Sequence, residues 1–165
     1  MRGLKSVFYI AIVILFFLPR VLTVSEKEKS LRVALVNSYA AGTWTDGIRN
    51  GVLSAAEKYQ VNVKITQIDY SSDYWDMQPF EKRQAEQERI FQELINSKPD
   101  QIIISDDEAA DFLGPKLYSS LWQGPVFFTG INNSEDGLSW LKPATRDRAV
   151  IVYEHFNSDQ MLALT

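Results

Sequence analysis

Short apolar segments that suit buried strands alternate along this chain with segments of helical spacing. The predicted strands cover residues 31–36, 61–68, 101–105, 125–130 and 149–153. The predicted helices begin near Thr43 or Thr45, at Pro79, after Asp106 and at Ser158. Strands that alternate with helices form βαβ units, in which successive strands are parallel and the crossovers right-handed. The alternation therefore predicts an α/β fold with a doubly wound, mostly parallel sheet of about five strands.

Two local signals interrupt this alternation. Residues 69–78 (DYSSDYWDMQ) form a long polar and aromatic stretch, which predicts a functional or mobile loop. Gly114-Pro115 follows soon after Asp106, and proline in a helix interior removes a hydrogen bond and clashes with the preceding turn. We therefore expect a short helix that breaks at Gly114-Pro115, with a second turn that runs to Leu121.

The N-terminal segment has the build of an export signal. Arg2 and Lys5 precede an uncharged apolar run at residues 7–18, and Pro19 and Arg20 end this run. Because a membrane-spanning helix needs about 20 apolar residues, the run is short for a stable span. We expect residues 1–24 to be a signal peptide or N-terminal anchor, residues 25–30 to be a charged tether, and the protein to be periplasmic or otherwise extracytoplasmic.

Composition excludes several classes of site. The chain has no cysteine, so disulfides and cysteine nucleophiles are ruled out. Removal of Arg2, Lys5 and Arg20 with the signal would leave 14 basic residues against 21 acidic ones, a net charge of −7. A protein of this charge, without clustered Lys and Arg, is a poor binder of nucleic-acid phosphates.

Polar loops follow four of the predicted strands. They cover residues 37–45, 69–76, 106–108 and 132–134. The carboxyl ends of parallel strands meet at one edge of a sheet, and open α/β sheets bind their ligands there. The first loop contains neither a glycine-rich phosphate cradle nor a nucleophile paired with a base, so these residues predict a binding site.

Three segments together resemble a known family. VALVNSYAAGTWTDGIRNG, PDQIIISDDEAADFL and GPVFFTGINN, in this order, are similar to the first lobe of periplasmic substrate-binding proteins of ABC transporters. Ligand-binding sensor domains of bacterial signalling proteins share the pattern. The resemblance implies a type I periplasmic-binding lobe of flavodoxin-like architecture over residues 31–153. Residues 154–165 would then begin the hinge or crossover helix, and we expect the second lobe, which closes on the ligand in this family, to be missing from this chain.

The first loop supplies three candidate ligand-binding residues. Tyr39 and Trp44 can stack on a planar or apolar ligand, and Ser38 can bind a carboxylate together with helix N-terminal amides. The alternative for Trp44 is that its ring packs the loop onto the lobe.

The loops after the third and fourth strands supply four more candidates. Asp106 and Asp107 can contact an amine or hydroxyl of a ligand, or one of them can simply cap the following helix. Asn132 and Asn133 can donate to and accept from a ligand, or form a turn.

Two further candidates are Tyr70, in a flap over the cleft that also contains Tyr74 and Trp75, and Glu154, near the hinge. The alternative for the flap is an anchor to the neighbouring lobe. His155 is the only histidine, so neither a catalytic triad nor a transition-metal site is assembled. We expect no catalytic residue, no metal and no cofactor.

The sequence thus predicts an exported solute-binding protein, not an enzyme. It would bind a small polar or aromatic metabolite and deliver it to an ABC permease. The alternative is an extracytoplasmic ligand-sensing domain, with a signalling partner at the membrane.

Overall fold

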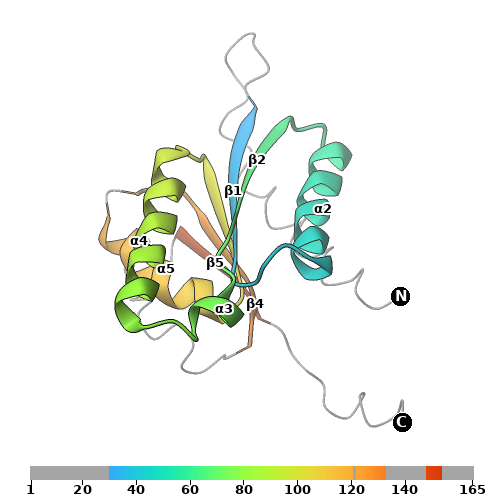
Figure 1. Ribbon diagram of the computed structural model, residues 1–165. Coiled ribbons are helices and arrows are strands. Elements are labelled where there is room, and N and C mark those ends of the chain that lie inside the picture. Colours follow the sequence, from blue (N-terminus) through green and yellow to red (C-terminus); the bar gives the residue numbers. More distant parts are fainter. Residues whose placement is uncertain (1–29, 121, 133–147, 154–165) are drawn as a thin grey trace, which may run out of the picture.

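The chain forms a five-stranded sheet in which every pair of neighbouring strands is parallel (Figure 1). The computed structural model describes residues 30–120, 122–132 and 148–153. The strands are β1 (Leu31–Asn37), β2 (Val63–Asp69), β3 (Gln101–Ser105), β4 (Val126–Ile131) and β5 (Ala149–Tyr153). The helices are α2 (Thr43–Lys58), α3 (Ser72–Trp75), α4 (Phe80–Asn96) and α5 (Asp107–Ser119). The predicted doubly wound α/β fold is confirmed, and the sheet is entirely parallel.

The strand order is β2-β1-β3-β4-β5, so the chain first adds β2 on one side of β1 and then crosses to the other side. The order therefore reverses between β1 and β3. In doubly wound folds this reversal opens a crevice between the first loops of the two halves, at the carboxyl ends of the strands.

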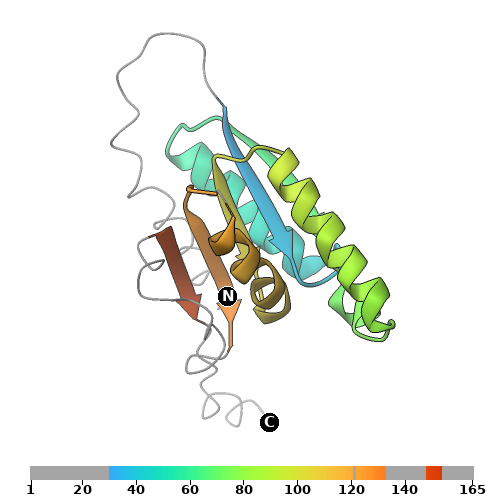
Figure 2. The ribbon, with the colours of Figure 1, turned by 90° about the vertical axis from the view of Figure 1, so that its left-hand side faces the viewer.

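Helices lie on both faces of the sheet, with α2 on one face and α4 and α5 on the other (Figure 2). The two faces have separate apolar cores. Ala34 and Val36 of β1 contribute to the larger core, with residues of α4 and α5, while Val33 and Leu35 pack with residues of α2. This division follows from the two-residue period of a strand, which sends successive side chains to opposite faces.

The position of each strand explains its composition. All residues of β3 are buried, as expected for a central strand covered on both faces, and its sequence is nearly continuous in isoleucine. In contrast, β2 lies at an edge, and only Ile68 among its residues is buried. The alternating apolar residues Val61, Val63 and Ile65 predict such a half-buried edge strand, and the structure confirms it.

Helix α5 corrects the prediction of a break at Gly114-Pro115, because it continues through both residues. Leu113 and Leu117, on either side of the proline, are buried against the core. A proline inside a helix costs about 3 kcal/mol, whereas burial of each leucine side chain gains about 1.5–3 kcal/mol. Tertiary packing on both sides of Pro115 therefore outweighs the local preference for a break.

The helices after β1 and β2 also differ from prediction in detail. Gly42 is the N-cap of α2, and Thr45 lies inside the helix, where its hydroxyl oxygen accepts a hydrogen bond from the Gly42 amide at 2.9 Å. The stretch predicted as a long loop contains the short helix α3.

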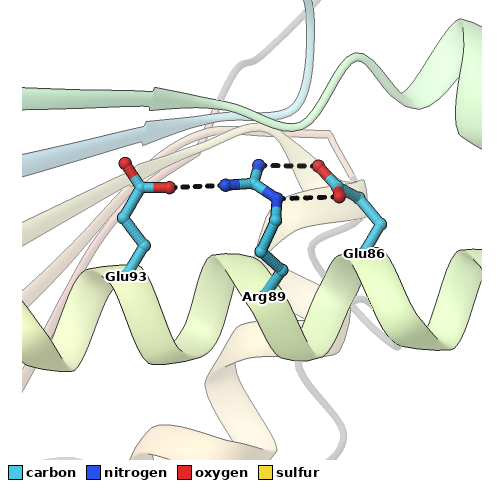
Figure 3. A network of polar contacts seen from close by, with 3 residues as sticks. All are labelled: Glu86, Arg89 and Glu93. Carbon is cyan, nitrogen blue, oxygen red and sulfur yellow. Dashed lines mark hydrogen bonds and ion pairs between the residues drawn. The ribbon is translucent and has the colours of Figure 1, made fainter.

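The charged residues between positions 81 and 88 predict a solvated outer face for α4, and the structure shows this face largely exposed. Arg89 donates to Glu86 at 2.7 and 2.8 Å and to Glu93 at 2.6 Å (Figure 3). Exposed pairs of this kind contribute about 0.3–0.5 kcal/mol each to a helix. They favour α4 without forming a site.

The expected N-terminal signal and tether lie outside the described residues, apart from Ser30, and so does the expected hinge segment at residues 154–165. Within the described ranges, no helix has the length and apolar character needed to cross a membrane.

Candidate functional site

A row of polar side chains crosses the sheet at the carboxyl ends of four neighbouring strands. Asn37 of β1 is in register with Asp69 of β2 on one side and with Ser105 of β3 on the other. Ser105 is in turn in register with Thr129 of β4. Asn37, Ser105 and Thr129 each lie two positions after a residue of the core on the α2 side, and Asp69 lies four positions after Ile65 of the same core. Residues two apart on a strand share a face, so all four face the α2 side of the sheet. We call Asp69, Asn37, Ser105 and Thr129 the polar row.

Asn37 lies at the reversal of strand order and is completely buried. Its side-chain nitrogen donates to the carboxylate of Asp69 at 2.7 Å. Its side-chain oxygen Oδ1 has no hydrogen-bond partner. A buried polar atom without a partner costs about 1–3 kcal/mol, so native structures keep few of them. Asn37 Oδ1 is therefore an acceptor available at this edge of the sheet.

Ser38 holds two elements together. Its hydroxyl donates to the Ser105 carbonyl at 2.8 Å and accepts from the Ala109 amide at 2.9 Å. Ala109 is in the first turn of α5, where backbone amides have no partner within the helix. Ser38 was predicted to bind a ligand carboxylate; in the structure its hydroxyl caps α5, and both of its hydrogen bonds are made within the protein.

Asp106 occupies the N-cap position of α5 but makes no side-chain capping bond. Instead, its Oδ2 accepts hydrogen bonds from the Ser105 hydroxyl at 2.8 Å and from the Trp44 indole nitrogen at 2.9 Å. Its backbone has a φ of 70°, a region that non-glycine residues visit rarely and Asp and Asn tolerate best. Only 6% of Asp106 is exposed, and this burial raises the pKa of its carboxyl group; the two hydrogen bonds act in the opposite direction.

Trp44 is anchored to the lobe and yet partly exposed. The indole N–H fixes the first turn of α2 to Asp106, yet 45% of the residue is exposed. Gly130, with a φ of 72°, lies against this contact: a Cβ atom there would be 2.9 Å from Asp106 Oδ1 and 3.5 Å from Trp44 Cζ2. Glycine at this position leaves room for the carboxylate and the indole to meet.

Tyr39 lies among carboxylates. Its hydroxyl is 3.5 Å from Glu108 Oε1, at the outer limit of a hydrogen bond. Burial and the negative charges of Glu108, Asp106 and Asp73 raise the pKa of Tyr39 to about 12. The second carboxylate oxygen of Glu108, Oε2, is buried and has no hydrogen-bond partner.

Asp107 and Asn132 bind one another. The Asp107 carboxylate accepts from the Asn132 backbone amide at 3.3 Å and from its side-chain nitrogen at 3.1 Å. This contact joins the start of α5 to the end of β4. Asn133 and Glu154, which were also predicted to bind ligand, and His155 lie outside the described residues.

Tyr70 corrects the prediction of a ligand-facing flap residue, because only 1% of it is exposed. Its ring packs against Phe112 with centroids 4.8 Å apart, and its hydroxyl accepts from Gln87 at 3.3 Å. The backbone that follows β2 turns this side chain into the larger core. In α3, Trp75 packs against the same core, while Tyr74 is exposed.

The structure brings Ser38, Trp44 and Asp106 together around the end of β3, and it adds residues that the sequence did not single out. Asn37, Ser105, Glu108 and Gly130 belong to the same region. One signal was present: Asn37 and Ser105 each end an apolar strand with a polar side chain. Which strands are neighbours, and hence which of these ends meet, is not visible locally.

Among the described residues, no group of three or more His, Cys, Asp or Glu side chains is arranged to hold a metal ion. Comparisons of the chain with protein-family models, with curated proteins and with solved structures give no match.

Proposed function

We propose that this chain is the first lobe of an exported solute-binding protein, which binds a small polar or aromatic metabolite for an ABC-type uptake system. The observation that carries the proposal is the buried, unpartnered Oδ1 of Asn37 at the reversal of strand order. Doubly wound sheets bind ligands at this place, and a ligand would give the oxygen its missing donor.

Trp44, in the first turn of α2 at the same edge of the sheet, also supports the proposal. Its ring is exposed but held by one hydrogen bond to a buried carboxylate, so it is oriented without being covered. An oriented, accessible aromatic face suits stacking on an apolar or planar ligand, because little conformational freedom is lost when the ligand binds.

The arrangement favours binding over catalysis. The hydroxyl of Ser38 donates to a backbone carbonyl, and that of Ser105 donates to a carboxylate whose other interaction is with Trp44. Neither hydroxyl is directed at a histidine or lysine base in the part of the chain that the structure describes. Hydrolytic turnover that disappears in Ser105→Ala would contradict this part of the proposal.

The proposal is tested by thermal unfolding of the full chain in the presence of a library of metabolites. A binding metabolite raises the midpoint Tm, by an amount that grows with its concentration. Trp44→Ala should abolish the increase. Tyr59→Ala is the matched control, because Tyr59 is an exposed aromatic residue at the opposite end of α2. An equal loss in both variants, or no stabilising metabolite, would contradict a site at the carboxyl edge.

Export is tested separately, by cell fractionation of the full chain and of a variant with charged residues in the apolar run at residues 7–18. We expect the full chain outside the cytoplasm and the variant within it. Equal retention of both chains in the cytoplasm would contradict export.

A further inference from the structure

The loops at the carboxyl edge carry charge of one sign. The segments at residues 37–45, 69–78 and 105–108 and the end of β4 at residues 129–132 contain no Lys, Arg or His. They contain the acidic residues Asp69, Asp73, Asp76, Asp106, Asp107 and Glu108. Among the described residues, Arg83 of α4 forms an ion pair with this set, 3.9 Å from Asp76.

The unused hydrogen-bonding capacity at this edge is accepting. Asn37, Trp44 and Ser105 each donate a side-chain hydrogen bond to a carboxylate. The buried side-chain atoms without a partner among the described residues here are Asn37 Oδ1 and Glu108 Oε2, and both are acceptors. A ligand that satisfies them must bring N–H or O–H donors.

Asn37 lies between Asp69 of β2 and Ser105 of β3 at this edge. The amide nitrogen is on the side of Asp69 in β2, so the oxygen, on the other branch of the amide, lies on the side of β3. There, Ser105 donates to Asp106. The free acceptor of β1 and the buried carboxylate that follows β3 therefore belong to neighbouring strands.

The helix dipoles do not reverse the sign of this field. The N-termini of α2 and α5 both reach this edge, and each contributes about half a positive charge. The carboxylates of Asp106, Asp107 and Glu108, all at the start of α5, carry more negative charge than these two partial positive charges offset. The negative charges at Asp106 and Glu108 also act on Tyr39, whose pKa they help to raise.

We propose that this edge binds an organic cation rich in N–H donors, a primary ammonium or a guanidinium group. Asp106 provides the counter-charge, Asn37 Oδ1 accepts a hydrogen bond, and the exposed ring of Trp44 covers the cation. Ammonium and guanidinium groups fit this set because they donate several hydrogen bonds, accept none and are attracted by the face of an indole ring. The inference rests on the proposed function and names the ligand class of the same site.

The indole N–H of Trp44 occupies one acceptor position of the Asp106 carboxylate. It is the donor that the protein itself directs to Asp106 Oδ2, together with the Ser105 hydroxyl. Asp106 Oδ1 receives no hydrogen bond from the described residues, so the cation has an oxygen of the same carboxylate to approach.

The test measures binding of putrescine, agmatine and butylamine to the full chain by calorimetry and thermal unfolding. Butanol and succinate are neutral and anionic probes of similar length, and calcium chloride tests for a metal ion. We expect the three amines to bind and the other probes not to bind. Asp106→Asn should weaken amine binding about tenfold or more, the effect of losing a hydrogen bond to a charged group.

Asp106→Asn is suited to this test because asparagine has the same shape and also tolerates a positive φ. Glu57→Gln, which removes a carboxylate of α2 away from this edge, is the matched control and should leave binding unchanged. Asn37→Leu should also weaken amine binding, and circular dichroism of each variant establishes that it is folded.

Amine binding that survives both Asp106→Asn and Asn37→Leu would overturn the inference, as would binding of calcium through Asp106. So would the failure of all three amines to bind at about 10 mM, above the millimolar range of weak ligands. If a neutral or anionic metabolite binds through Trp44 instead, the ligand class is wrong and the proposed function stands. If no ligand binds through Trp44, both are wrong.

Discussion

Replacement of Gly130 by alanine tests the geometry around Asp106 most directly. Gly130 has a φ of 72°, in the left-handed region, which costs a residue with a Cβ atom about 1–2 kcal/mol. The new Cβ would also lie 2.9 Å from Asp106 Oδ1, closer than van der Waals contact allows. The carboxylate cannot simply rotate away, because its Oδ2 is held by Ser105 and Trp44.

Relief of the clash should therefore disturb at least one of these two bonds to a charged acceptor. A bond of this kind contributes about 1.5–3 kcal/mol. With the backbone term, we expect Gly130→Ala to lower the free energy of unfolding by about 2.5–5 kcal/mol. Urea unfolding of the full chain, followed by circular dichroism, measures this change.

Gly47→Ala is the matched control for this experiment. Gly47 lies inside α2, and a Cβ added there would meet no atom within 4 Å. The same substitution should raise the free energy of unfolding by about 0.5–1 kcal/mol, because alanine has the higher helix propensity. A change of less than about 1 kcal/mol in Gly130→Ala would refute both the positive φ and the anchored carboxylate.

Three further substitutions test separate contacts. Ser38→Ala removes the hydrogen bond that the hydroxyl donates to the Ser105 carbonyl of β3 and the cap of α5. It should lower the free energy of unfolding, measured in urea, by about 1–3 kcal/mol. An unchanged midpoint of unfolding would contradict the cap. Tyr39 has a pKa of about 12 in the folded chain against 10.0 ordinarily, so its neutral form favours folding below pH 10 and this contribution is lost as the pH rises through 12. The free energy of unfolding of the unmodified chain should therefore fall relative to Tyr39→Phe over that range, and parallel pH profiles would contradict the shift. Arg89→Gln should cost less than about 1 kcal/mol, and less still in added salt, because Arg89 is 54% exposed; a larger cost that is insensitive to salt would contradict a solvated surface.

The sequence by itself determined the fold class and the edge at which polar loops gather. Apolar strand segments and helical spacing are local patterns, and strands joined through helices are parallel almost without alternative. For the same reason, residues after each strand, such as Ser38 and Asp106, had to lie at one edge. The charged outer face of α4 was likewise visible, since i, i+3 and i, i+4 neighbours such as Glu86, Arg89 and Glu93 share a helix face.

Only the tertiary structure decided which of these residues meet. Ser38 caps a helix that begins 69 residues later in the chain, and Tyr70 turns inward to Phe112, because both contacts depend on strand order and packing rather than on local preference. Helix α5 continues through Pro115 for the same reason: leucines on both sides of it are buried. The placement of β1 between β2 and β3 puts Asn37 beside both Asp69 and Ser105, and leaves one buried oxygen without a donor. Long-range register, which no short stretch of sequence encodes, creates that acceptor.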